Sequence, residues 1–277
     1  MKKFSLCAFA DEAGESVNEQ IDALNENEIE FLEVRGVDGK NISELTKPEV
    51  EDLKIRLDAG GIETWSIGSP IGKIEITDDF ASQLELFKRV LETAQILNAK
   101  CIRLFSFYVK DGKYEEARDE VMRRLSSFCE EAKGSGVVLC HENEKGIYGD
   151  QFERCAEIHK TLPEIKAVFD PANFIQCGVD IKKAWNALSE YVYYLHIKDA
   201  AEDSNIVPAG HGIGEIAWIL SQYEARNGEV LTIEPHLSVF KGLEGLEHGE
   251  QSVVGKYEYP NQRAAFDAAV LALKKLI

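Results

Sequence analysis

The most constraining feature of this chain is a regular alternation of short apolar segments with longer segments of helical periodicity. The short segments are rich in β-branched and aromatic residues, as buried strands are. They cover Phe4–Ala10, Ile29–Arg35, Ile62–Gly68, Lys100–Phe107, Gly136–Asn143, Glu164–Asp170, Tyr191–Ile197 and Glu229–Leu237. The helical segments that follow them cover residues 16–28, 47–61, 79–97, 114–133, 151–162, 181–190, 215–227 and 262–276. Strands that are separated by helices pair in parallel through right-handed crossovers.

Eight strand–helix units in 277 residues fit a closed (β/α)₈ barrel better than an open sheet. A doubly wound open sheet is the alternative, but no G-x-G-x-x-G opens a helix after a strand and no P-loop is present. No Pro- or Ser-rich linker divides the chain. We therefore predict an α/β protein with one TIM barrel domain over residues 1–277.

The charge of the chain argues against general binding to nucleic acid. Lys and Arg number 31 against 49 Asp and Glu, which gives a net charge of −18. Such a charge repels phosphate backbones and anionic lipid over the surface as a whole. Because 44% of the residues are hydrophobic, the chain can also bury a large core.

The cysteines and the N-terminus predict a cytoplasmic protein. None of the six cysteines forms a C-x-x-C pair, and Cys7, Cys101 and Cys140 lie in apolar segments, as reduced core thiols do. The short mixed run after Lys3 is interrupted by Asp11 and Glu12 too soon for a signal peptide, and no apolar run reaches the ~20 residues of a membrane span. We expect neither a membrane nor a nucleic acid as partner.

The ends of the last four predicted strands carry the strongest functional signal. In a (β/α)₈ barrel the C-terminal ends of all strands meet at one face, where catalytic groups collect. Strands five to eight end in or near Glu142, Asp170, His196 and Glu234. Three carboxylates in a small volume repel each other, and a divalent cation relieves that repulsion. The sequence therefore predicts one metal ion, Mn²⁺, Mg²⁺, Zn²⁺ or Co²⁺, bound by these four side chains.

Other residues near the strand ends are candidates for contacts with a substrate. Arg35 and Lys73 either bind hydroxyl or phosphate oxygens or are solvated, ion-paired charges. His236, two residues after Glu234, is a candidate for the shell around the metal ligands. His141 is not predicted to be a ligand, because strand alternation points it away from the side of Glu142.

One long irregular segment, Ser238–Tyr259, follows the last predicted strand. A loop of this length is often functional, so we expect an active-site flap or a contact in a homo-oligomer, with a surface insertion as the alternative.

Several short motifs resemble those of the xylose isomerase-like superfamily of sugar isomerases and epimerases. They are HENEKGIYGD from His141, VFDPANF from Val168, HIKDA from His196 and IEPHL from Ile233. RGVDGKNI from Arg35 and GSPIGKI from Gly68 are similar to a subgroup described as sugar phosphate isomerases/epimerases.

The resemblance implies a (β/α)₈ barrel with one divalent metal, as in the tagatose-epimerase-like branch. It implies Glu142, Asp170, His196 and Glu234 as ligands and the two glutamates as the acid/base pair. Two positions depart from the family's pattern. Asn173 stands where many relatives have histidine, and Lys198 is the basic residue near His196 where many have arginine. Both are candidates for hydrogen bonds to the substrate.

The expected function is a metal-dependent sugar or sugar phosphate isomerase or epimerase that transfers protons through a metal-bound enediolate. Its partner would be a small-molecule sugar. One alternative is a glycosidase-type hydrolase, which would use paired carboxylates without a metal. Another is a non-catalytic sugar-binding barrel. A DNA-repair endonuclease of the same superfamily would need more histidine ligands than six histidines supply, and a basic surface.

Overall fold

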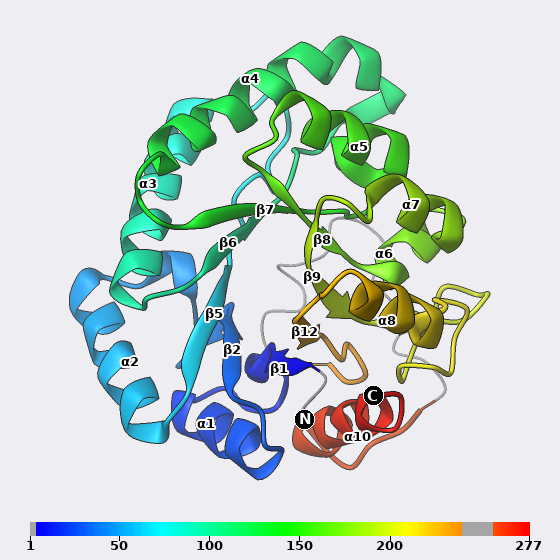
Figure 1. Ribbon diagram of the computed structural model, residues 1–277. Coiled ribbons are helices and arrows are strands. Elements are labelled where there is room, and N and C mark those ends of the chain that lie inside the picture. Colours follow the sequence, from blue (N-terminus) through cyan, green and yellow to red (C-terminus); the bar gives the residue numbers. More distant parts are fainter. Residues whose placement is uncertain (1–3, 240–256) are drawn as a thin grey trace.

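The computed structural model describes residues 4–239 and 257–277. Parallel strands form a closed barrel in the order β1-β12-β9-β8-β7-β6-β5-β2, and helices surround it (Figure 1). The strands are β1 (Ser5–Ala8), β2 (Phe31–Val34), β5 (Glu63–Gly68), β6 (Cys101–Leu104), β7 (Val138–Glu142), β8 (Lys166–Phe169), β9 (Val192–Ile197) and β12 (Val230–Ile233). The (β/α)₈ prediction is confirmed, and the open sheet is excluded.

Each predicted helical segment contains one helix on the outside of the barrel. These are α1 (Val17–Glu26), α2 (Lys47–Gly60), α3 (Phe80–Ile96), α4 (Tyr114–Ala132), α5 (Phe152–Thr161), α7 (Ile181–Leu188), α8 (Ile216–Ala225) and α10 (Gln262–Lys274). No helix within residues 4–239 and 257–277 combines the length and apolar character that crossing a membrane requires.

Several short elements at the loops were not predicted. They are the helix α6 (Pro171–Gln176), the hairpins β3 (Gly36–Val37) with β4 (Lys40–Asn41) and β10 (Asp199–Ala200) with β11 (Ile206–Val207), and the 3₁₀ turns η1 (Ala10–Glu12), η2 (Ile42–Glu44), η3 (Lys110–Gly112) and η4 (Tyr148–Asp150). Helix α6 starts at Asp170, whose side chain accepts the N–H of Asn173 at 2.9 Å, with Pro171 at the first helical position.

Several strands, among them β6 and β12, end earlier than predicted, because their last predicted residues leave the ladder to form loops. The N–H of Phe105, for example, donates to the carbonyl of Ile71 at 2.8 Å, so β6 ends at Leu104.

Strand alternation separates two environments along each strand. Cys140 of β7, Tyr194 of β9 and Val230 of β12 belong to an apolar cluster that also contains Cys7 and Cys101. The residues that alternate with them along each strand, such as Leu139, Leu195 and Leu231, belong to the larger core that includes the helices. Glu142 and His196 follow Cys140 and Tyr194 by two residues, and Glu234 follows Val230 by four, so all three lie on the same side, beyond the apolar cluster. All six cysteines are free thiols, as predicted.

Helix α5 contributes a buried histidine to the packing against β7. His159 is 1% exposed, its Nδ1 lies 3.1 Å from the carbonyl oxygen of Ile165, and its ring is 5.9 Å from that of His141. Burial lowers the pKa of His159 to about 4, against the opposing effect of the Ile165 carbonyl.

We predict that His159 makes the protein less stable in mild acid. The folded state keeps this ring neutral below the ordinary pKa of 6.5, while the unfolded chain takes up a proton, so stability present above pH 6.5 is lost as the pH falls toward 4. The His159→Gln variant should lose less stability than the wild type, by about 2 kcal/mol, between about pH 7 and pH 5. Urea unfolding at both pH values measures this difference. Equal losses in the two proteins would contradict the prediction.

Candidate functional site

The four side chains predicted to bind a metal meet at the C-terminal end of the barrel. Glu142, Asp170, His196 and Glu234 each offer one nitrogen or oxygen atom, and these atoms all lie within 4.8 Å of one another. All four residues are at most 4% exposed. Within this cluster, His196 Nδ1 lies 3.0 Å from Glu142 Oε1 and 3.4 Å from Glu234 Oε2. Donor atoms about 3 Å apart are what ligands at ~2.1 Å from one cation require, so the cluster fits a divalent ion.

A second glutamate holds the histidine of this cluster from the other side. His196 Nε2 lies 3.2 Å from Glu33 Oε2, and the hydroxyl of Tyr194 donates to Glu33 Oε1 at 2.9 Å. Burial opposes a charge on the imidazole, but the carboxylates of Glu142 and Glu33 outweigh it and raise the pKa of His196 well above its usual range. With Nδ1 facing the cluster, Glu33 is the partner that would orient the ring toward a metal.

Buried cations balance the carboxylates. The guanidinium of Arg103 donates to Glu142 Oε2 at 2.8 Å, and the ammonium of Lys198 lies 2.9 Å from Asp170 Oδ2 and 3.0 Å from Glu234 Oε2. Both cations are at most 5% exposed, so these pairs are poorly screened by water.

These contacts shift the pKa values of the three carboxylates in different directions. Burial alone would raise the pKa of Glu142, but the charges of His196 and Arg103 outweigh it and lower that pKa to about 2. Burial raises the pKa of Asp170 to about 7, against the opposing charge of Lys198. For Glu234, Lys198 outweighs burial, so its pKa lies well below the usual range.

Arg35 and His236, both predicted near the site, contact Glu234 on its outer side. Arg35 donates to Glu234 Oε1 at 3.1 Å, and its other nitrogens donate to Asp11 and Glu12 at 2.9–3.0 Å. His236 Nε2 lies 3.4 Å from both Glu12 Oε1 and Glu234 Oε1. The backbone N–H of His236 donates to Glu12 Oε2 at 2.6 Å. Glu12, Glu234 and His236 thus form a second group of donor atoms within 4.8 Å. This group shares Glu234 with the first, and it offers three donor residues where the first offers four.

Asn173 contacts two members of the four-residue cluster. Its side-chain amide donates to Glu142 Oε1 at 3.2 Å and to the carbonyl of Asn143 at 2.9 Å, while its N–H donates to Asp170. The residue therefore orders the cluster from α6, whatever contact with a substrate it also makes.

Lys73 lies beyond the ring of Phe105. Its ammonium pairs with Glu144 at 2.9 Å and lies 4.4 Å from the ring centroid, and the guanidinium of Arg103 lies 4.5 Å from the same centroid. Gly72 permits the close packing here: its φ is +87°, and a Cβ at this position would lie 2.1 Å from the carbonyl oxygen of Phe105.

His141 points away from the cluster, as predicted. Its Nε2 lies 2.9 Å from the hydroxyl of Ser106, which also accepts the N–H of Gly149. Burial, together with the neighbouring ring of His159, lowers the pKa of His141 to about 3, so this residue is a neutral packing group.

Sequence reasoning did not assign Glu33 or Arg103 to the site. A signal for each was present, because Glu33 and Arg103 interrupt otherwise apolar strands at inward positions. A charge inside a buried strand needs a partner. The predicted flap, Ser238–Tyr259, lies for the most part outside the described residues.

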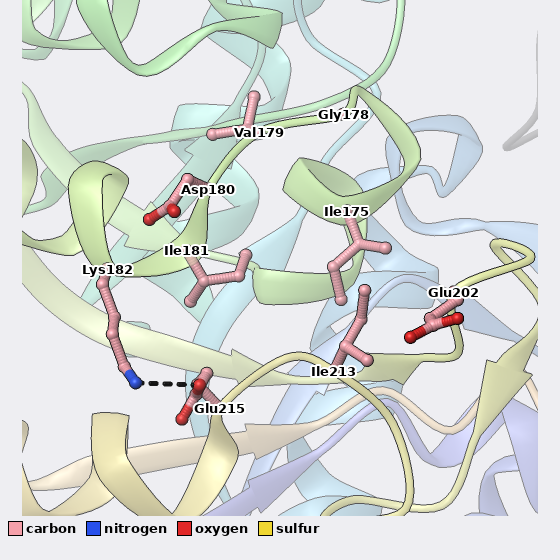
Figure 2. Close-up of a pocket in the computed structure, with 9 residues that line it drawn as sticks. All are labelled: Ile175, Gly178, Val179, Asp180, Ile181, Lys182, Glu202, Ile213 and Glu215. Atoms are coloured by element: carbon pink, nitrogen blue, oxygen red, sulfur yellow. Dashed lines mark ion pairs between the residues drawn. The ribbon is translucent and has the colours of Figure 1, made fainter.

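A separate hollow of about 470 Å³ lies beside α6 and α7 (Figure 2). Ile175, Ile181 and Ile213 line it, and the ion pair of Lys182 with Glu215, 2.9 Å long, spans one edge. Its lining includes none of the four cluster residues, so it is not the candidate site.

Removing one buried cation tests how far the cluster depends on charge balance. Arg103→Met leaves the Glu142 carboxylate buried with less compensation, and we expect a loss of about 3–5 kcal/mol in the free energy of unfolding. Arg123→Met, which breaks an exposed pair with Glu120, should cost no more than about 1 kcal/mol. Urea unfolding with a chelator present measures both. Similar losses in the two variants would show that charge balance matters little here.

Comparisons with known proteins agree with this architecture. A family model described as the xylose isomerase-like TIM barrel matches residues 21–248. Similar solved structures include a D-tagatose 3-epimerase-like protein, with 17% identity, a TM-score of 0.75, and coverage of 99% of this chain and 97% of that chain. The IOLI protein with a binding zinc atom has 15% identity, a TM-score of 0.74, and coverage of 99% and 98%.

A third similar structure is the probable 3-DHS dehydratase AsbF from Bacillus anthracis, with 17% identity, a TM-score of 0.72, and coverage of 99% and 98%. No curated protein matches the chain. At these identities the solved structures show a common fold, while the family model spans more than half of the sequence. The chain belongs to the xylose isomerase-like TIM barrel family.

Proposed function

We propose that this protein is a metal-dependent isomerase or epimerase that acts on a small sugar or sugar phosphate. The observation that carries the proposal is the convergence of Glu142, Asp170, His196 Nδ1 and Glu234 at the end of the barrel where catalytic groups collect. The D-tagatose 3-epimerase-like protein and a D-psicose 3-epimerase among the similar structures support this class of reaction.

The same four residues would hold the metal. Mn²⁺, Mg²⁺, Zn²⁺ and Co²⁺ all suit three carboxylates and one imidazole, and zinc is the metal in the structure of the IOLI protein. When bound, a divalent ion acts as a Lewis acid that polarises a substrate carbonyl and acidifies the neighbouring C–H.

Glu142 and Glu234 are the proposed acid/base pair. They come from β7 and β12, which β8 and β9 separate in the barrel, so they border the cluster from different sides. Their low pKa values keep both carboxylates ionised at neutral pH, the form that accepts a proton. Isomerisation needs one base that returns the proton to the adjacent carbon, whereas epimerisation needs a donor on the opposite face.

Three cationic or amide side chains border this pair and would orient substrate hydroxyls. Lys198 and Asn173 donate to members of the cluster, and Lys73 lies beyond Phe105 on the side of β6. A hydrolase that uses two carboxylates needs no imidazole between them. The placement of His196 against Glu142, Glu234 and Glu33 therefore favours the metal-dependent reaction over a glycosidase.

The proposal is tested by metal analysis and by exchange of substrate hydrogen with solvent. The purified protein is assayed for bound metal and then incubated in D₂O with a panel of ketoses and their phosphates. Deuterium at a carbon next to the carbonyl, lost on chelation, supports the proposal. Loss of water from the product would instead indicate β-elimination, which starts with the same proton removal. Absence of metal binding and of exchange with every sugar would refute the proposal.

We predict that Glu142→Gln and Glu234→Gln each lower the exchange rate by at least about 10²-fold, because an amide cannot accept the proton. Bound metal is measured alongside, since both residues are also proposed ligands. Glu144→Gln, which removes a neighbouring carboxylate that pairs with Lys73, should retain exchange. Full activity in the Glu142 and Glu234 variants would rule out the proposed acid/base roles.

We further predict that Glu33→Gln weakens metal binding by about 10–100-fold. The amide accepts a weaker hydrogen bond from His196 Nε2 and lowers the basicity of the ring. Calorimetric titration of the metal-stripped protein with Mn²⁺ measures the change. Tyr194→Phe, which removes only the outer hydrogen bond to Glu33, should have a smaller effect.

A further inference from the structure

We propose that the ammonium group of Lys198 competes with the metal for the same two carboxylate oxygens, so that this lysine holds the cluster together without metal and sets its metal affinity. The inference rests on the metal site of the proposed function and adds a regulator of its occupancy. It concerns a residue that the sequence analysis assigned to substrate binding alone.

The contacts of Lys198 identify the two oxygens. Its Nζ lies 2.9 Å from Asp170 Oδ2 and 3.0 Å from Glu234 Oε2. The other oxygen of each carboxylate is engaged elsewhere: Asp170 Oδ1 accepts the N–H of Asn173, and Glu234 Oε1 accepts Arg35. Oδ2 and Oε2 are therefore the oxygens of these residues that remain for a metal.

The position of Lys198 on its strand directs it to this place. It follows His196 by two residues, so both side chains extend toward the inside of the barrel end. Glu234 Oε2 lies 3.0 Å from the Lys198 ammonium and 3.4 Å from His196 Nδ1. One carboxylate oxygen thus links the lysine to the imidazole nitrogen that faces the cluster.

The two arginines nearby are placed differently. Arg103 contacts Glu142 Oε2, whereas Glu142 Oε1 faces His196, and Arg35 contacts Glu234 Oε1 on its outer side. Both guanidinium groups can keep these contacts while the inner oxygens bind a metal. Lys198 alone of these three cations pairs with the inner oxygens of Asp170 and Glu234.

A divalent ion within ~2.1 Å of those oxygens would stand close to the ammonium, and two cations repel strongly in a buried site. The flexible four-carbon stem of lysine lets the ammonium withdraw, as a planar guanidinium in a bidentate pair cannot. Metal binding therefore includes the cost of displacing Lys198. In return, the lysine compensates the carboxylates whenever the metal is absent.

The test compares Lys198→Met with the wild type after removal of bound metal. Methionine is one atom shorter than lysine and removes the charge while keeping an unbranched, flexible side chain. Calorimetric titration with Mn²⁺ should show binding at least about tenfold tighter in the variant. The metal-free variant should melt at a Tm lower by roughly 4 °C or more, and saturating Mn²⁺ should remove this difference. The matched control is Lys73→Met, which replaces a partly buried lysine paired with Glu144 and should leave Mn²⁺ affinity unchanged.

Unchanged or weaker Mn²⁺ binding by the Lys198 variant overturns the proposal. If the metal-free variant does not fold, the proposal requires that Mn²⁺ restore its fold, and a variant that Mn²⁺ does not rescue also contradicts it. A wild-type protein that binds no Mn²⁺, Mg²⁺, Zn²⁺ or Co²⁺ refutes the proposed function itself. The two failures are thus distinguishable.

Discussion

Compensation of buried negative charge at one end of the barrel is the constraint on which the rest of this structure depends. Glu12, Glu33, Glu142, Asp170 and Glu234 are each at most 4% exposed. Carboxylates so close together cannot all be ionised and buried unless cations accompany them. The fold supplies those cations from strands distant in the sequence, which makes the charge balance a property of the closed barrel and not of any local segment.

Along a barrel strand, the first inward-facing side chains pack in the apolar cluster and the last ones belong to the candidate site. On β7, Cys140 packs in the apolar cluster and Glu142 belongs to the site, and on β9 Tyr194 and His196 divide in the same way. Tyr194 also connects the two layers, because its hydroxyl donates to Glu33, which in turn holds His196. The apolar layer therefore fixes the orientation of the imidazole as well as closing the bottom of the site.

The sequence predicted the parts of this arrangement that depend on periodicity. Every strand of the barrel lies within its predicted range, and the four-residue cluster forms, because strand ends and alternation are local properties. Pairings such as Arg103 with Glu142, 39 residues apart, depend on how strands are staggered around the barrel. Helix α6 was missed although Asp170-Pro171 is a helix-start signal. Its aspartate had been assigned to the metal alone, yet one oxygen caps the helix while the other faces Lys198.

If the proposed metal site is correct, this double use of Asp170 sets folding against metal binding. Lys198 makes the buried carboxylates tolerable while the chain folds without a metal, and the same contact must be given up when a metal binds. His196 has a related conflict, since a proton on Nδ1 that donates to Glu142 would occupy the lone pair that a metal needs. On this proposal Lys198 withdraws when a metal binds, while Arg35 and Arg103 keep their contacts with Glu234 and Glu142. In this proposal the two arginines hold the carboxylates in place, and Lys198 controls whether a metal can reach them.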